Sequence, residues 1–162
     1  MAAQDLDKPG WRATKAESGM SDYDSDILVW SERQGALLRR RAAGELVNDR
    51  ELDWPNIAEE IESVGRSQLS AVRSFIIQAL AHDLKAEAWP NSQAVPGWRA
   101  EAVRFRQEAA EAFAPSMRQH IDMAKLYALA VRRLPGMIHG QAPLPVAPTC
   151  PVTLDQLLQL GD

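Results

Sequence analysis

The chain has 162 residues, of which 46% are hydrophobic and 25% charged, with a formal net charge of −4. This composition excludes disordered, collagen-like and membrane-embedded proteins and is typical of a globular domain with one core. A pI near 5.4 argues against nucleic acid as a partner, because the phosphate backbone attracts an excess of Lys and Arg.

The N-terminal segment is polar and mixed in charge. We expect residues 1–21 to be frayed or disordered, and residues 22–162 to form a single helical domain. The segment has no apolar core of a signal peptide, and no run elsewhere reaches the ~18 apolar residues of a membrane span. Cys150 is the only cysteine, which excludes an intramolecular disulfide and a cysteine-rich zinc site. These features predict a cytoplasmic protein without a membrane partner.

Two helical regions fill the first half of the domain. Spacings of three and four predict a helix over about 23–43, with a stripe made of Ile27, Trp30, Gln34, Leu37, Leu38 and Arg41. Gly44 follows this helix and can adopt the left-handed conformation that often ends a helix. Asp53 is expected to cap a second region over about 54–88, where Ile57, Ile61 and Val64 share a face. Gly65 predicts a break into two helices there.

Two further helices and an extended strap complete the predicted chain. Apolar stripes predict helices over about 97–113 and 116–134. Five prolines in 135–151 exclude helix and central strand, so this stretch is expected to form a strap across the bundle. Thr153 and Gln156 form a capping-box pattern that opens a short leucine-rich helix over 153–160. The predicted fold is therefore all-α: a helical bundle of four or five main helices with a proline-rich C-terminal strap and a short last helix.

Several of these residues match a pattern that is found in a known protein family. They are Trp30 with Gln34 and Leu37-Leu38, the block DWPNIAEEIESVGRS at 53–67, His82 with Lys85, Gly97-Trp98-Arg99, and Cys150-Pro151 before the leucine-rich helix. Together they resemble the bacterial family known as domain of unknown function twenty-nine, over about Tyr23 to Leu160. The resemblance implies an all-helical domain with no established activity. Where that family usually has His-Leu-Leu-Lys-Trp, this chain has His82, Asp83, Leu84, Lys85 and Ala86.

Acidic residues and histidines form the first candidate polar site. Glu59, Glu60 and Glu62 are the densest acidic cluster, which suits either a divalent cation or a solvated helix face. His82 joins them in a possible metal site, although no histidine follows a glutamate at the Glu-x-x-His spacing of di-iron bundles. The simpler interpretation of each histidine is structural. No cofactor or metal is predicted.

Basic residues and one misplaced acid complete the candidate site. Arg99 and Arg106 lie on one side of their predicted helix. Such a pair suits either the binding of a phosphate or carboxylate, or ion pairs with acidic residues of the bundle itself. The apolar periodicity predicts a leucine at position 83, but the chain has Asp83 there, close to His82 and Lys85. We expect Asp83 either to pair with a cation from a neighbouring helix or to lie where the helix ends or turns away.

No catalytic constellation stands out, so enzymatic activity stays open. Cys150 lies inside the strap, where an anchoring role is simpler than a nucleophilic one. The sequence favours a protein–protein interaction or accessory module whose partner is another protein or a second copy of itself. The alternative is a metal-dependent hydrolase or nuclease that uses Glu59, Glu62 and His82.

Overall fold

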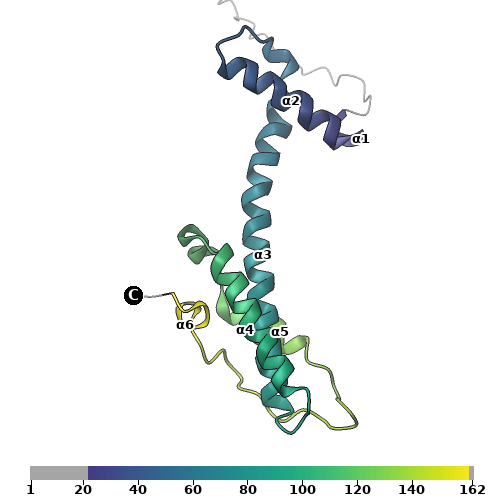
Figure 1. The fold of residues 1–162 in the computed structure, drawn as a ribbon, viewed down its shortest axis with the longest axis vertical. Coiled ribbons are helices and arrows are strands. Elements are labelled where there is room, and N and C mark those ends of the chain that lie inside the picture. Colours follow the sequence, from purple (N-terminus) through teal and green to yellow (C-terminus); the bar gives the residue numbers. More distant parts are fainter. Residues whose placement is uncertain (1–21, 161–162) are drawn as a thin grey trace, which may run out of the picture. The chain divides into compact units, whose positions relative to one another are not determined.

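The computed structural model describes residues 22–160, and these are helical apart from their connections (Figure 1). The elements in chain order are α1 (Asp22–Ser25), α2 (Ile27–Ala42), η1 (Asp49–Glu51), α3 (Trp54–Ala88), α4 (Val95–Ala112), η2 (Pro115–His120), α5 (Met123–Arg132) and α6 (Leu154–Leu158), where η marks a 3-10 helix. Within the described range the only β-type pairing is an isolated bridge between Ile138 and Gln141. The all-α prediction is confirmed. The expectation for residues 1–21 lies outside the described residues.

The chain divides into two compact units. Unit 1 ends at Glu60 and unit 2 runs from Ile61 onward, so that α3 begins in the first and continues in the second. The expectation of one domain over residues 22–162 therefore stays a prediction.

Local signals define the helix ends of unit 1. The Asp26 side chain accepts a hydrogen bond from the Val29 amide and thereby separates α1 from α2, where one helix over 23–43 was predicted. Gly44 follows α2 with a φ of 82°, and the amides of Gly44 and Glu45 donate to the carbonyls of Arg41 and Arg40. This is a Schellman ending, as the position of the glycine predicted.

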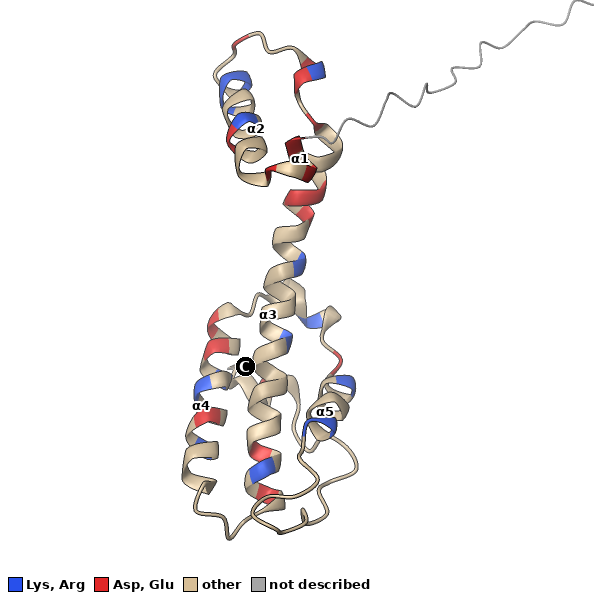
Figure 2. Cartoon of the chain, turned by 90° about the vertical axis from the view of Figure 1, so that its right-hand side faces the viewer, with Lys and Arg blue, Asp and Glu red and all other residues tan. Residues whose placement is uncertain are grey.

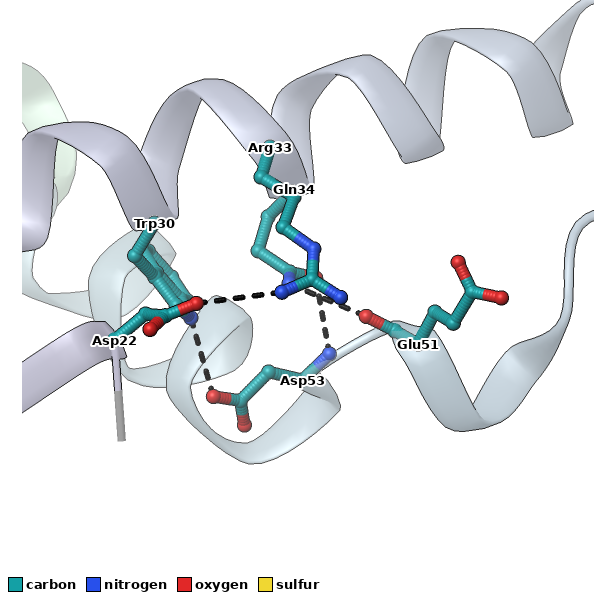
Figure 3. Close-up of polar contacts among 6 residues, drawn as sticks. All are labelled: Asp22, Trp30, Arg33, Gln34, Glu51 and Asp53. Carbon is teal, nitrogen blue, oxygen red and sulfur yellow. Dashed lines mark hydrogen bonds and ion pairs between the residues drawn. The ribbon is translucent and has the colours of Figure 1, made fainter. Parts of the chain in front are cut away.

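A buried glutamine and an indole hold unit 1 together (Figure 3). The Gln34 side chain donates to the carbonyl of Glu51 (3.2 Å) and accepts from the amide of Asp53 (3.0 Å). The Trp30 indole N–H donates to the Asp53 carboxylate at 3.1 Å, and that carboxylate also caps the start of α3. The apolar core around these bonds consists of Trp30, Leu37, Leu52 and Ile57.

Helix α3 runs through Gly65 without interruption, so the predicted break there was wrong. One glycine in a helix interior is disfavoured by only about 1 kcal/mol relative to alanine, which is too little to end a helix of 35 residues. The face expected to carry Ile57, Ile61 and Val64 is not uniformly buried. Ile57 is 7% exposed, whereas Ile61 is 69% and Val64 62% exposed.

The core of unit 2 forms around the C-terminal half of α3. Val72 and Ile76 are fully buried, and Ile77, Leu80 and Leu84 lie beside them. Helices α4, α5 and α6 cover this face with the following buried residues: Ala109, Leu126, Tyr127, Ala130, Leu154, Leu157 and Leu158. Helix α4 begins at Val95, two residues before the predicted start.

The helix predicted over 116–134 is two elements. The 3-10 helix η2 ends at His120, and α5 begins at Met123 because the Asp122 carboxylate caps it by accepting from the Lys125 amide (3.1 Å). The apolar periodicity continues across this junction, so it gave no sign of the cap.

The strap is extended, as predicted, and bonds to the helices that it crosses (Figure 1). The amide of Leu144 donates to the carbonyl of Ala88 at the end of α3 (2.9 Å), and the Tyr127 hydroxyl donates to the carbonyl of Ala147 (2.7 Å). The predicted capping box of Thr153 and Gln156 is present and starts α6, which is shorter than the predicted 153–160. The half-buried Cys150 packs against the core of unit 2.

Candidate functional site

Three of the predicted polar residues meet where α3 faces α4. Asp83 on α3 forms an ion pair with Arg106 on α4, and the two side chains are 28% and 30% exposed. A cation from a neighbouring helix thus compensates the acid that interrupts the apolar stripe, which confirms one of the two expected outcomes. Arg106 therefore has Asp83 as its ion-pair partner.

His82 lies beside this pair in an aromatic stack. Its imidazole is nearly parallel to the ring of Phe105, with centroids 5.7 Å apart and an interplanar angle of 18°. Phe105 also stacks on Phe75 at 6.3 Å, and the guanidinium carbon of Arg104 lies 4.1 Å from the Phe105 ring centre. The Nδ1 atom of His82 is buried and has no hydrogen-bond partner.

The surroundings of His82 disfavour its protonated form. Burial lowers the pKa of the imidazole below its usual value, and the positive charge of Lys85 lowers it further, against weaker opposing effects of Glu101 and Asp83. The imidazole is therefore neutral at pH 7. A neutral imidazole is chemically able to act as a base or a metal ligand.

A small cavity adjoins the Asp83–Arg106 pair. It holds about 190 Å³ and is lined by Asp83, Glu87, Arg106, Tyr127 and apolar residues of α3 and the strap. Burial and the nearby charge of Glu87 raise the pKa of the Tyr127 hydroxyl. The volume is below the 300–1,000 Å³ that organic ligands usually occupy.

The acidic cluster does not join His82. Glu60 accepts a hydrogen bond from the Tyr23 hydroxyl at 2.6 Å, and Glu62 pairs with Arg66 at 3.4 Å. Twenty positions of the same helix separate Glu62 from His82, which corresponds to a rise of about 30 Å. Glu59 is exposed within the same turns of α3 as Glu60 and Glu62.

The remaining candidates also lie apart. Arg99 is exposed near the start of α4, two turns from the half-buried Arg106, and Lys85 is half-buried on α3. The two other histidines of the chain, His120 and His139, lie in η2 and in the strap, each next to a different open hollow, of about 530 Å³ and 560 Å³. Over residues 22–160 no group of three or more His, Cys, Asp or Glu side chains is arranged to hold a metal ion.

Unit 1 carries a second candidate site, which the sequence did not predict. Ile27, Leu28 and Val29 open α2 and are 50%, 64% and 52% exposed. Trp54 is also 45% exposed, but it lies near Arg41 at the opposite end of α2. The stripe predicted for this helix included Ile27 on the buried side. Three consecutive apolar residues cannot all lie on one helical stripe, so at least one of them must be exposed. This run of three was the feature of the sequence from which the exposed surface could have been predicted.

Three aspartates directly precede this apolar surface in the chain. Asp22 and Asp24 lie in α1 and Asp26 precedes α2, while the basic residues Arg39, Arg40 and Arg41 lie at the opposite end of α2 (Figure 2). Asp22 pairs with Arg33 at 3.3 Å on the exposed surface. Aspartates thus lie next to the apolar start of α2, and one of them is paired with Arg33.

Comparisons with known proteins agree with the helical architecture. The family model described as Domain of unknown function DUF29 matches residues 23–161. A crystal structure of an alpha-helical protein of unknown function from Rhodospirillum rubrum is similar, with 25% sequence identity and a TM-score of 0.58 over 88% of this chain and 92% of that one. No curated protein shows a significant match. None of the helices within residues 22–160 has the length and hydrophobicity that a membrane crossing requires.

Proposed function

The chain belongs to the Domain of unknown function DUF29 family, which assigns no activity, and we propose from the geometry that it is a protein-interaction module. In this proposal, unit 1 binds a partner protein through the apolar start of α2. The interaction takes place in the bacterial cytosol, where the free thiol of Cys150 stays reduced.

One observation carries the proposal: within residues 22–60, more large apolar side chains are exposed than buried. Its core consists of the four residues Trp30, Leu37, Leu52 and Ile57. The exposed set comprises Ile27, Leu28, Val29, Leu46 and Trp54. A partner that covers this surface would supply the apolar burial that the core of the unit lacks.

The chemistry of the surface specifies the kind of partner. Leu28 and its neighbours offer an apolar centre, and Asp22, Asp24 and Asp26 border it with negative charge. Protein interfaces combine an apolar core with a polar rim, and complementary charges on the rim steer association. The partner is therefore a protein whose apolar surface is bordered by Lys or Arg.

The test compares two tagged variants with the native chain in the source cell. Leu28→Glu places a charge in the centre of the surface, and Leu144→Glu places one on the strap, where Leu144 is 53% exposed. We expect a stoichiometric partner to co-purify with the native chain and with Leu144→Glu but to be lost from Leu28→Glu. The isolated partner should then bind the purified native chain more weakly as salt is raised. Equal recovery with all three chains would contradict the proposal.

A further inference from the structure

The open hollow beside His120 in unit 2 has both apolar and charged residues in its lining. Residues of α3, of the end of η2 and of the first turns of α5 surround it, and we call it the α3–α5 hollow. Its volume of about 530 Å³ is within the range of 300–1,000 Å³ that small organic ligands usually occupy. Ile77 and Leu126 line it from the core of unit 2, and Leu129, which is 41% exposed, adds apolar surface that a ligand can reach.

Positive charge exceeds negative charge in this lining. Its basic residues are Arg73, His120 and Lys125, and its acid is Asp122. The Asp122 carboxylate lies 3.5 Å from the Lys125 ammonium and balances that charge. Over residues 22–160, no carboxylate forms an ion pair with Arg73, whose hydrogen-bond partner is a backbone carbonyl. The α3–α5 hollow therefore has one full positive charge that the chain does not neutralise.

The half-buried guanidinium of Arg73 is held in place but keeps most of its donors. Its Nη2 atom donates to the carbonyl of His120, which joins α3 to η2. A carbonyl is neutral, so this bond fixes the side chain without balancing its charge. A guanidinium has five N–H groups in a planar fork, and a single bond from Nη2 leaves one two-donor edge of the fork complete. Such an edge matches the two oxygens of a carboxylate.

We propose that the α3–α5 hollow binds a monocarboxylate with a short apolar chain, such as a medium-chain fatty acid. The carboxylate pairs with the Arg73 guanidinium, and the chain covers the apolar surface of Ile77, Leu126 and Leu129. The charge selects an anion and the apolar lining selects its chain, so that a ligand needs both parts to bind well. The site lies within unit 2 and does not rest on the function proposed for unit 1.

The first experiment titrates octanoate into the full chain and follows the heat of binding by calorimetry. At neutral pH the carboxyl group of octanoate is ionised. We expect saturable binding with a dissociation constant of about 0.1–1 mM. Acetate lacks the chain and 1-octanol lacks the charge, so each should bind at least about tenfold more weakly. Octanoate that shows no saturable binding, or octanol that binds as tightly as octanoate, would overturn the proposal.

A matched pair of variants locates the binding at Arg73. Arg73→Gln removes the charge but keeps an N–H donor for the His120 carbonyl, and it should weaken octanoate binding at least about tenfold. Arg133→Gln is the control, because Arg133 is exposed at the end of α5 and does not line the hollow. It should bind octanoate like the native chain, and circular dichroism should show the same helix content in all three chains. Native affinity in Arg73→Gln would overturn the assignment.

A third variant should bind more tightly, which a damaged fold cannot imitate. Asp122→Asn removes the negative charge from the lining and releases Lys125 from its ion pair. Asparagine caps helices about as well as aspartate, so α5 should keep its start. We expect the affinity for octanoate to rise about threefold or more, because a like charge next to the carboxylate is gone. An unchanged or lower affinity would contradict recognition of the ligand by charge.

Discussion

The imidazole of His82 stacks on the ring of Phe105, and burial and the positive charge of Lys85 lower its pKa and favour the neutral form. A group whose pKa is lower in the folded than in the unfolded state binds fewer protons when folded. The contribution of His82 to stability is therefore fully present above its unfolded-state pKa of about 6.5. Stability falls as the pH is lowered from about 6.5 through the folded-state pKa of His82.

We predict that His82→Phe removes this part of the pH dependence while it keeps the stack on Phe105. Urea unfolding of the native chain and of the variant, at pH values between about 7 and 5, measures the difference. The native chain should lose more stability than the variant over this interval. Identical pH profiles would mean that His82 protonates in the folded protein as easily as in the unfolded one.

The Asp83–Arg106 pair leads to a second prediction at the residue scale. Asp83→Leu leaves the Arg106 guanidinium half-buried without its partner, so we expect a loss of about 1–2 kcal/mol, reduced from the fully buried case because both side chains are about 30% exposed. The double change Asp83→Leu/Arg106→Met should return to within about 1 kcal/mol of the native chain, because apolar residues replace a half-buried ion pair without stranding a charge.

Chemical denaturation of the single and double variants measures this coupling. Glu101→Leu is the matched control, since it removes a partner from the more exposed Arg104 and should change stability by less than about 1 kcal/mol. A double variant that is several kcal/mol less stable than the native chain would show that the pair does more than satisfy two charges.

At the scale of the elements, the sequence predicted those helix ends that depend on neighbouring residues. Gly44 and the capping box of Thr153 and Gln156 lie where the pattern placed them, because such caps need only a few consecutive residues. Asp26 and Asp122 also cap helices, but the apolar periodicity continues past each of them and hid both junctions. At such a junction one capping carboxylate starts a new helix, although the apolar periodicity continues without a break.

The candidate site was predictable in part, because the interruption of an apolar stripe is a local feature of the sequence. The stripe identified Asp83 as an acid that needs a partner, and the structure supplies Arg106. The exposure of Ile27 and Val64 was not predictable, because a pattern tells which residues are apolar but not whether the chain has anything to cover them.

The short helix α6 gives a prediction at this scale. Leu157 is 3% exposed and lies in the core of unit 2. We expect Leu157→Ala to lower the free energy of unfolding by about 2–4 kcal/mol, since it removes buried methyl groups and leaves a cavity. Thermal and urea denaturation measure the loss, and Leu144→Ala on the exposed part of the strap is the control, with a change of less than about 0.5 kcal/mol. Equal effects of the two changes would contradict the docking of α6.

At the scale of the whole molecule, the two units differ in the apolar burial that stabilises them. Unit 1 has a core of four buried residues, whereas the core of unit 2 includes the fully buried Val72 and Ile76 and residues from α3, α4, α5 and α6. Segments with little buried apolar contact open at lower free energy than the global unfolding of a domain.

We therefore predict that amides of α2 exchange with deuterium faster than those of α3 between Val72 and Leu84. Native-state hydrogen exchange, read by mass spectrometry of peptides from each helix, measures the two rates under one condition. The amides of α4 provide an internal reference within unit 2. Protection of α2 equal to that of the centre of α3 would show that unit 1 is as stable as unit 2.

The packing of α6 into the core of unit 2 has a consequence for synthesis on the ribosome. Helix α3 ends at Ala88, but Leu154, Leu157 and Leu158, which cover part of its buried face, are translated about 70 residues later. At 5–20 residues per second, this interval is roughly 4–14 s. During that time the apolar face of α3 is complete but only partly covered. We therefore expect chaperones that bind exposed apolar helices to recognise the nascent chain, and unit 2 to finish folding only once α6 has left the exit tunnel.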